Sequence, residues 1–504
     1  MHVSSKVAAL AVLAVCLAAA APAQGQVGRR FPSEKKVVED KKTGVPMTVL
    51  TSGQSSDAKI YQTHPQWTAD GKWIIFRSSG RSEGSQAYAV NEATGDIVQL
   101  TEGPGNNTGS LNVARKSMKL YFMRNATAAT QPAASRPAEQ SAATQAAATQ
   151  AGTGQAGTGQ AAATQAGATT RRGQRDDSND VHQVIELDLE RLFADSEKNS
   201  APSQARGSAV QPAKAYERIC ATLPPGLASA GGVALDADEQ VIYMGARGLD
   251  VGKHLPPGTK VLDRPEGARL GAGPGALRAF DLRTGEMKVI IDTPFQVGHV
   301  QTNPWVPGEI IYCWETGGDA PQRMFTVRAD GSGNRPLFEE EKLDWVTHEA
   351  VVTRDEVMFN LIGHQSRLRV RPTGIAVINL RSNAVQLIDQ IEEREPDRNQ
   401  LGANAAGSDS YGGYWHCNGS PDGRWAVGDT FGGNIWLIDR RDGKRTLWSS
   451  DHKMRPDHAH PTFDASSTKV LIQSGHFTDG QRLSLVVLPV PVEMLEKQPA
   501  EAKP

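Results

Sequence analysis

The stretch Ala69-Asp70-Gly71-Lys72-Trp73-Ile74-Ile75-Phe76 decides the fold, because its pattern returns along the chain. It joins a turn containing Asp and Gly to a short apolar strand. Related segments recur at residues 116–123, 236–244, 307–314, 354–361, 421–429 and 464–473. Where no insertion intervenes, the copies lie about forty residues apart, which is typical of propeller blades.

A second strand follows each copy after a polar loop. In the first unit this half covers residues 86–100, with a turn at Thr94-Gly95-Asp96. One such unit cannot bury both faces of its small sheet, whereas units packed around an axis can. We therefore predict an all-β fold, a seven-bladed β-propeller over residues 51–490. Side chains from different blades would meet near the central axis of this propeller.

The composition agrees with one large closed architecture. The 504 residues include 50 Gly and 29 Pro, which suits many turns and short strands better than helices. The net charge of -2, without a basic block, argues against a nucleic-acid partner. A P-loop, a dinucleotide fingerprint, an EF-hand loop and a G-x-S-x-G elbow are all absent from the sequence.

Residues 1–23 are predicted to be a signal peptide. Lys6 precedes the apolar stretch 7–21, and Ala21-Pro22-Ala23 offers small residues for cleavage. Polar sequence follows at once, so we expect export to the periplasm or the medium rather than a membrane span. The remaining cysteines are Cys220, Cys313 and Cys417, too few for a disulfide framework.

Three further segments stand apart from the repeats. Residues 24–50 look like a polar N-terminal leader, and residues 491–504 form a C-terminal tail. Residues 126–180 are rich in Ala, Thr, Gln and Gly and hold almost no large apolar side chain. We interpret this last segment as a disordered insertion, because it cannot bury enough surface to offset the entropy of ordering. An alanine-rich helix is the alternative, and the spacing of Gly and Thr disfavours it.

Several of the 12 histidines lie at equivalent positions, a few residues before the blade repeats. These are His64, His299, His348, His416 and the pair His458 and His460. In a propeller, equivalent positions converge on one face near the axis. His458 and His460 would point to the same side of an extended chain, since strand periodicity is two. Together with His416 they suit a divalent ion such as manganese, zinc, iron or nickel. The alternative is that each histidine caps a turn or bonds a backbone carbonyl.

Some of these motifs resemble those of oligogalacturonate lyases. The resemblance rests on Val297-Gly298-His299-Val300-Gln301, Gln322-Arg323-Met324, Trp345-Val346-Thr347-His348-Glu349, His416 ahead of Ser420-Pro421-Asp422-Gly423, and His458-x-His460-Pro461. It is strongest between residues 297 and 475.

The resemblance implies a seven-bladed propeller with a Mn²⁺-like divalent ion. His416, His458 and His460 would then be metal ligands, His348 the base, and Arg323 an aid at the substrate. One position departs from the family, because Arg455 stands where the family places a further glutamine ligand. Arginine has no lone pair for a metal. The ion would bind more weakly, take water or Asp457 instead, or be absent.

Four other residues are candidates for substrate contact. They are His299 and Gln301 within the resembling stretch, Arg77 after the first repeat, and Trp415 beside a glycine pair. Arg77 would meet an acidic substrate, and Trp415 would stack on a sugar ring. The alternative for Arg77 is a solvated surface side chain, and the alternative for Trp415 is packing between blades. We expect Glu349 to face away from the site, because it neighbours His348 in a strand.

These expectations lead to a metal-dependent lyase that cleaves short uronate oligosaccharides by β-elimination. Its partner would be an acidic oligosaccharide. One alternative is a non-catalytic, TolB-like exported propeller that binds a protein or a glycan. A third is a hydrolase or an epimerase on the same face, and an epimerase would need a second acid such as His299 or Tyr414.

Overall fold

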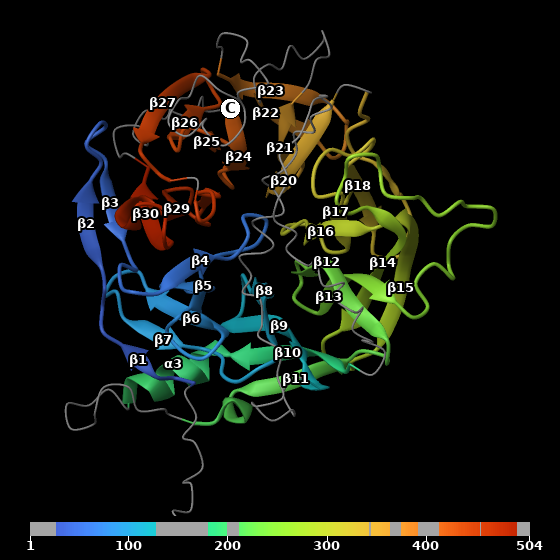
Figure 1. Ribbon diagram of the computed structural model, residues 1–504, viewed down its shortest axis with the longest axis horizontal. Helices are drawn as coiled ribbons and strands as arrows, with labels where there is room; N and C mark the ends of the chain where they lie inside the picture. Colours follow the sequence, from blue (N-terminus) through green and yellow to red (C-terminus); the bar gives the residue numbers. More distant parts are fainter. Residues whose placement is uncertain are drawn as a thin grey trace, which may run out of the picture.

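The computed structural model describes residues 27–127, 180–198, 211–341, 344–362, 374–391, 413–453 and 455–490. In this part of the chain, seven antiparallel sheets surround a central axis (Figure 1). The prediction of a seven-bladed β-propeller is thereby confirmed. The expected signal peptide 1–23, the tail 491–504 and nearly all of the insertion 126–180 lie outside the described residues.

Each blade runs outwards from the axis in chain order, and the strands are as follows. Blade one contains β4 (Ser56–Lys59), β5 (Trp73–Ser79), β6 (Ser85–Asn91) and β7 (Ile97–Gln99), with β1 (Arg30–Phe31) outside them. Blade two contains β8 (Asn106–Val113), β9 (Lys119–Asn125), β10 (His182–Asp188) and β11 (Glu217–Thr222). Blade three contains β12 (Leu227–Leu235), β13 (Val241–Gly248), β14 (Ala272–Asp281) and β15 (Met287–Phe295).

The remaining blades follow the same plan. Blade four contains β16 (Val297–Thr302), β17 (Glu309–Trp314), β18 (Met324–Arg328) and β19 (Arg335–Pro336). Blade five contains β20 (Trp345–Thr353), β21 (Glu356–Ile362), β22 (Gly374–Asn379) and β23 (Val385–Gln390). Blade six contains β24 (Tyr414–Gly419), β25 (Trp425–Thr430), β26 (Ile435–Asp439) and β27 (Lys444–Ser449).

Blade seven joins the two ends of the chain. It contains β28 (Thr462–Phe463), β29 (Lys469–Ser474) and β30 (Ser484–Pro489), followed outwards by β3 (Pro46–Val49) and β2 (Lys36–Glu39). Backbone pairing between β3 and β30 aligns Val49 with Val486. The segment 24–50, interpreted from the sequence as a leader, thus supplies two strands of the last blade. These strands close the ring.

The core lies between neighbouring blades. Every residue of β25 is buried, because each sheet is covered by another sheet on both faces. Ile75 of blade one and Phe122 of blade two, for example, belong to one buried cluster. The helix α3 (Leu189–Lys198) packs outside blade one, where Phe193 stacks on Trp73 with ring centroids 4.3 Å apart. Two 3₁₀ turns, Ala213–Ala215 and His476–Thr478, complete the described regular elements.

No helix among the described residues is both long and apolar enough to cross a bilayer.

The innermost strands are bulged near the axis. Pairing shifts register between Gly298 and Gln301 in β16 and between Thr347 and Ala350 in β20. At these bulges His299 and His348 adopt left-handed backbone angles, with φ of 47° and 56°, and His460 before β28 does the same at 48°. Left-handed backbone is unfavourable for residues other than glycine and tends to gather at functional sites.

Candidate metal centre

Four histidines from three consecutive blades lie close together. His348 comes from β20, His416 from β24, and His458 and His460 from the segment before β28. The ring centroid of His416 lies 4.1 Å from that of His348, 3.8 Å from that of His460 and 5.2 Å from that of His458. All four side chains are buried. The sequence-predicted metal set and the predicted base therefore share one cluster.

Asp429 on β25 holds this cluster together. Its carboxylate lies 3.1 Å from His416 Nδ1 and accepts the backbone N–H groups of His416, Ala459 and His460. The carboxylate thus connects blade six with the segment before β28. With Nδ1 occupied in this way, Nε2 of His416 remains for another partner. A carboxylate behind an imidazole is the usual support of a histidine metal ligand.

The cluster contains buried nitrogens that no protein group satisfies. Both ring nitrogens of His348, both of His458 and Nδ1 of His460 lack a hydrogen-bond partner among the described residues. Leaving a buried polar atom unsatisfied costs about 1–3 kcal/mol. Ligand atoms of His416, His458 and Asp429 also lie within 4.8 Å of one another. These donors fit a divalent cation, which would satisfy several nitrogens at once.

The protonation of the histidines agrees with metal binding. Burial, followed by the effect of neighbouring imidazoles, lowers the pKa of His348 and of His416 well below the ordinary value. Burial also lowers the pKa of His458 to about 4. These rings are consequently neutral at pH 7. A neutral imidazole offers the lone pair that a metal requires.

Asp457 stands beside the cluster, whereas Arg455 does not enter it. Asp457 Oδ1 lies 3.3 Å from His460 Nε2, and its Oδ2 accepts a 2.8 Å hydrogen bond from Gln473 Nε2. Burial favours a higher pKa for Asp457, but His460 and His458 hold this pKa below its usual value. Arg455 is exposed. Asp457 is therefore the polar group that accompanies the histidines, in place of the glutamine that the family resemblance implied.

Next to the histidine cluster, Arg323 of blade four forms a charged group with His299 of the same blade and Glu349 of blade five. Arg323 is buried, with its Nε 3.4 Å from Glu349 Oε2 and its Nη2 3.4 Å from His299 Nδ1. Burial alone would raise the pKa of Glu349, but Arg323 and His299 lower this pKa to about 2. Glu349, expected to face away from the site, thus places a buried carboxylate in the charged group around Arg323.

Tyr61 lies between the histidine cluster and the charged group around Arg323. The sequence analysis did not identify this residue. Its ring contacts those of His299 and His460 edge-on, with centroids 5.4 Å away in both cases. Burial raises the pKa of its phenol well above the ordinary value. Tyr61 belongs to the loop between β4 and β5, and no motif surrounds it. Only the folded ring brings this loop between blades four and seven.

The other predicted substrate contacts occupy different surroundings. Gln301 is buried and bonds the backbone of β20 twice, at Glu349 O and Val351 N, so it connects blades four and five. Trp415 is 6% exposed and packs on His348 and Phe431, which makes it a wall of the cluster.

Arg77 and His64 differ in their relation to the cluster. Arg77 is partly buried, and within the described residues its side chain forms no hydrogen bond or ion pair, although it lies close enough to Asp457 to interact electrostatically. His64 does not join the four histidines. Its Nδ1 bonds Thr63 Oγ1 and its Nε2 bonds Val233 O.

Comparisons with known proteins identify the fold. No family model matches the chain, and no curated protein matches its sequence. Among solved structures, an oligogalacturonate lyase in complex with manganese is similar at a TM-score of 0.63 and 16% identity. The oligogalacturonate lyase of Vibrio parahaemolyticus is similar at 0.62 and 16%. Each match covers 93% of this chain and 99% of the other. TolB from Acinetobacter baumannii is matched at only 0.32. The chain therefore has the propeller fold of oligogalacturonate lyases, over nearly its whole length.

Proposed function

We propose that this protein is a metal-dependent lyase that cleaves short, oligogalacturonate-like uronate chains by β-elimination. The observation that carries the proposal is the cluster of four buried histidines, three of which have unsatisfied ring nitrogens. The cations Arg77 and Arg323 lie close enough to interact electrostatically with Asp457 and His348, respectively. The likeness of the whole chain to two oligogalacturonate lyases supports the same class of reaction.

The charges beside the cluster suit an acidic sugar. A uronate carries a carboxylate next to carbon five, and the guanidinium group pairs well with carboxylates. The side chain of Arg77 forms no hydrogen bond or ion pair among the described residues, so its guanidinium group is available for such a pair. Burial lowers its pKa from a very high ordinary value, yet arginine stays charged at neutral pH. Arg77 is therefore the proposed contact for a substrate carboxylate.

His416, His458 and His460 would hold the divalent ion, with Asp429 fixing the orientation of His416. When bound, such an ion acts as a Lewis acid on the carboxylate and eases removal of the proton from carbon five. Manganese is the ion we expect. Asp457 is placed to add an oxygen ligand beside His460.

His348 is the proposed proton acceptor. Its ring is neutral at pH 7, and neither nitrogen is occupied by a protein group among the described residues. Trp415 contacts it edge-on at 4.9 Å and limits its movement. Arg323 would stabilise negative charge on the oxygen that leaves carbon four. The products are a shortened chain and a sugar with a new double bond, and no water adds across the cleaved bond.

The test is an elimination assay. The protein, freed of metal and reloaded with Mn²⁺, is incubated with di- and trigalacturonate, and absorbance of the conjugated product is followed. We expect His348→Gln to lower the rate about 10²- to 10⁴-fold, the range for loss of a general base, with metal content unchanged. We expect His458→Ala to lose both the metal and the activity.

The pattern of results separates the alternatives. Loss of metal in His348→Gln would make His348 a ligand and would remove it as the base. Absence of product from galacturonate and glucuronate oligomers, in a protein that retains its metal, would refute the lyase and leave a binding propeller. Product mass distinguishes elimination from hydrolysis, which adds water, and from epimerisation, which leaves chain length unchanged.

We also propose that the protein acts outside the cytoplasm, because residues 1–23 have the pattern of a cleaved signal peptide. The N-terminal residue of the protein recovered from the periplasm or the medium tests this directly.

A further inference from the structure

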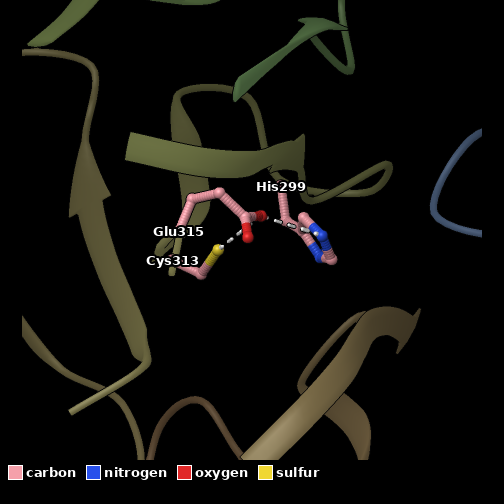
Figure 2. Close-up of side chains that lie close together, drawn as sticks. All are labelled: His299, Cys313 and Glu315. Atoms are coloured by element: carbon pink, nitrogen blue, oxygen red, sulfur yellow. Dashed lines mark hydrogen bonds and ion pairs between the residues drawn. The ribbon is translucent and has the colours of Figure 1, made fainter. Parts of the chain in front are cut away.

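Blade four carries a second group of potential metal ligands. His299 on β16, Cys313 on β17 and Glu315 just after β17 offer three ligand atoms that lie within 4.8 Å of one another. Glu315 Oε2 is the shared neighbour, 3.3 Å from His299 Nε2 and 4.0 Å from Cys313 Sγ (Figure 2). The Tyr61 ring lies between His299 and His460, and so separates this group from the four histidines.

The backbone is shaped to bring the three groups together. A Cβ atom on Gly298 would stand 2.7 Å from Glu315 Oε2 and 3.0 Å from Cys313 Sγ, so only glycine leaves room for them here. The bulge that follows Gly298 turns His299 towards them through a left-handed backbone angle. Gly317 N–H donates a 2.7 Å hydrogen bond to Glu315 Oε1. One carboxylate oxygen is thus fixed by the backbone, and the other is directed at His299 and Cys313.

The opposite side of His299 is supported by another carboxylate. Glu349 Oε1 lies 3.3 Å from His299 Nδ1, is fully buried and has no hydrogen bond within the described part of the chain. Asp429 lies similarly close to Nδ1 of His416 in the first cluster, at 3.1 Å, and there forms a hydrogen bond. In both places a buried carboxylate faces one imidazole nitrogen and leaves the other for a ligand.

The charges of the group leave a place for a cation. Glu315 and Glu349 bring two negative charges, and Arg323 offsets one of them. Cys313 adds a third negative charge whenever it is ionised. A divalent ion with a thiolate ligand would therefore neutralise the group.

We propose that His299, Cys313 and Glu315 form a second metal site, which takes a divalent ion of the zinc class. A donor set of one nitrogen, one sulfur and one oxygen suits zinc or cobalt, because the soft thiolate ligand favours these ions over the harder manganese and magnesium. Three protein ligands leave a position for water or for a substrate oxygen. His299 then acts as a ligand rather than as the substrate contact expected from the sequence.

The experiment uses Co²⁺ as a spectroscopic probe on the metal-free, full-length mature protein. Cobalt bound to a thiolate gives a charge-transfer absorption in the near ultraviolet, which nitrogen and oxygen ligands do not produce. We expect this absorption in the wild type and its loss in Cys313→Ser. Cys220→Ser is the matched control, because Cys220 is also buried and unpaired but lies in blade two. Zinc titration should give two ions per chain in the wild type and one in Cys313→Ser.

The first cluster is tested in the same way but independently. His458→Ala should lose one zinc ion and keep the cobalt–thiolate absorption. This absorption does not depend on lyase activity, so failure of the proposed reaction leaves the second site standing. Absence of the absorption in the wild type, or equal zinc stoichiometry in wild type and Cys313→Ser, would overturn the second site. The group would then be an ion-pair network around Arg323.

Discussion

At the scale of single residues, Asp429 connects the parts of the candidate metal centre. Its carboxylate binds the imidazole of His416 and three backbone N–H groups, two of which belong to the segment that carries His458 and His460. Burial raises the pKa of this carboxyl group, while the nearby imidazoles and the N–H groups oppose the change. One acid therefore sets the distance between ligands from two blades.

Asp429→Asn should weaken metal binding without unfolding the protein. The amide oxygen can still accept N–H groups, but the amide nitrogen cannot accept the proton of His416 Nδ1. We expect affinity for Mn²⁺ to fall about 10- to 100-fold, as measured by titration calorimetry. Asp439→Asn in the same blade is the control, because Asp439 is buried and pairs with Arg441 away from the cluster. Equal affinity in both variants would contradict the orienting role.

At the scale of elements, the bulges of the inner strands place the site. Simple alternation along β20 predicted that Glu349 would face away from the functional groups around His348. The register shift between Thr347 and Ala350 breaks this alternation, so His348 joins the metal cluster and Glu349 joins the group around Arg323. A strand with regular pairing would direct only one of these two neighbours towards the channel.

The contact between blades six and seven should make stability depend on pH. His452 is buried between Ser449 Oγ at the end of β27 and Ser474 Oγ at the end of β29, at 2.8 Å from each. Burial lowers its pKa from 6.5 to about 4. The unfolded chain therefore binds the proton first, and stability is full above pH 6.5 and declines as the pH falls towards 4.

For one such group the loss is about 1.4 kcal/mol per pH unit within that window. We expect the thermal midpoint to fall between pH 7 and pH 5, and to fall less in His452→Gln, which carries no titrating proton. His254→Gln is the control, because His254 is exposed and lies in blade three, away from His452. An identical shift in the wild type and in His452→Gln would show that His452 does not contribute.

At the scale of the whole molecule, closure of the ring brings the ligands together. Blade seven needs β2 and β3 from the N-terminal part of the chain to cover β30. Met47 and Val49 of β3 are buried in the same cluster as Trp425 of blade six. The segment that holds His458 and His460 enters this blade, so the candidate metal centre depends on the closing strands.

Deletion of residues 1–50 should open the ring, whereas deletion of residues 1–26 should not. We expect the longer deletion to be less soluble and to lose metal binding.

Met47→Ala is a milder test of the closing strand β3, and loss of this buried side chain should lower the free energy of unfolding by about 2–5 kcal/mol. Denaturant unfolding of this variant, beside the equally conservative but exposed Val37→Ala, checks the prediction. Equal midpoints for both variants would show that β3 is dispensable.

The sequence alone determined the number of blades and most of the ligand candidates. Turn residues and alternating apolar runs are local signals, so all seven units, including 69–76 and 421–429, were found as strands. His348, His416, His458 and His460 come together as their equivalent positions ahead of the blades suggested, whereas His64 and His299, at the same kind of position, do not join them.

Only the tertiary structure decided how the candidates are grouped. It placed Tyr61 between His299 and His460, put Glu315 beside Cys313, and assigned Asp429 to two blades at once. It also moved residues 36–49 from a leader into the last sheet. These contacts join segments far apart in the chain and depend on bulges that break strand periodicity. No local pattern encodes them, because they exist only once the ring has closed.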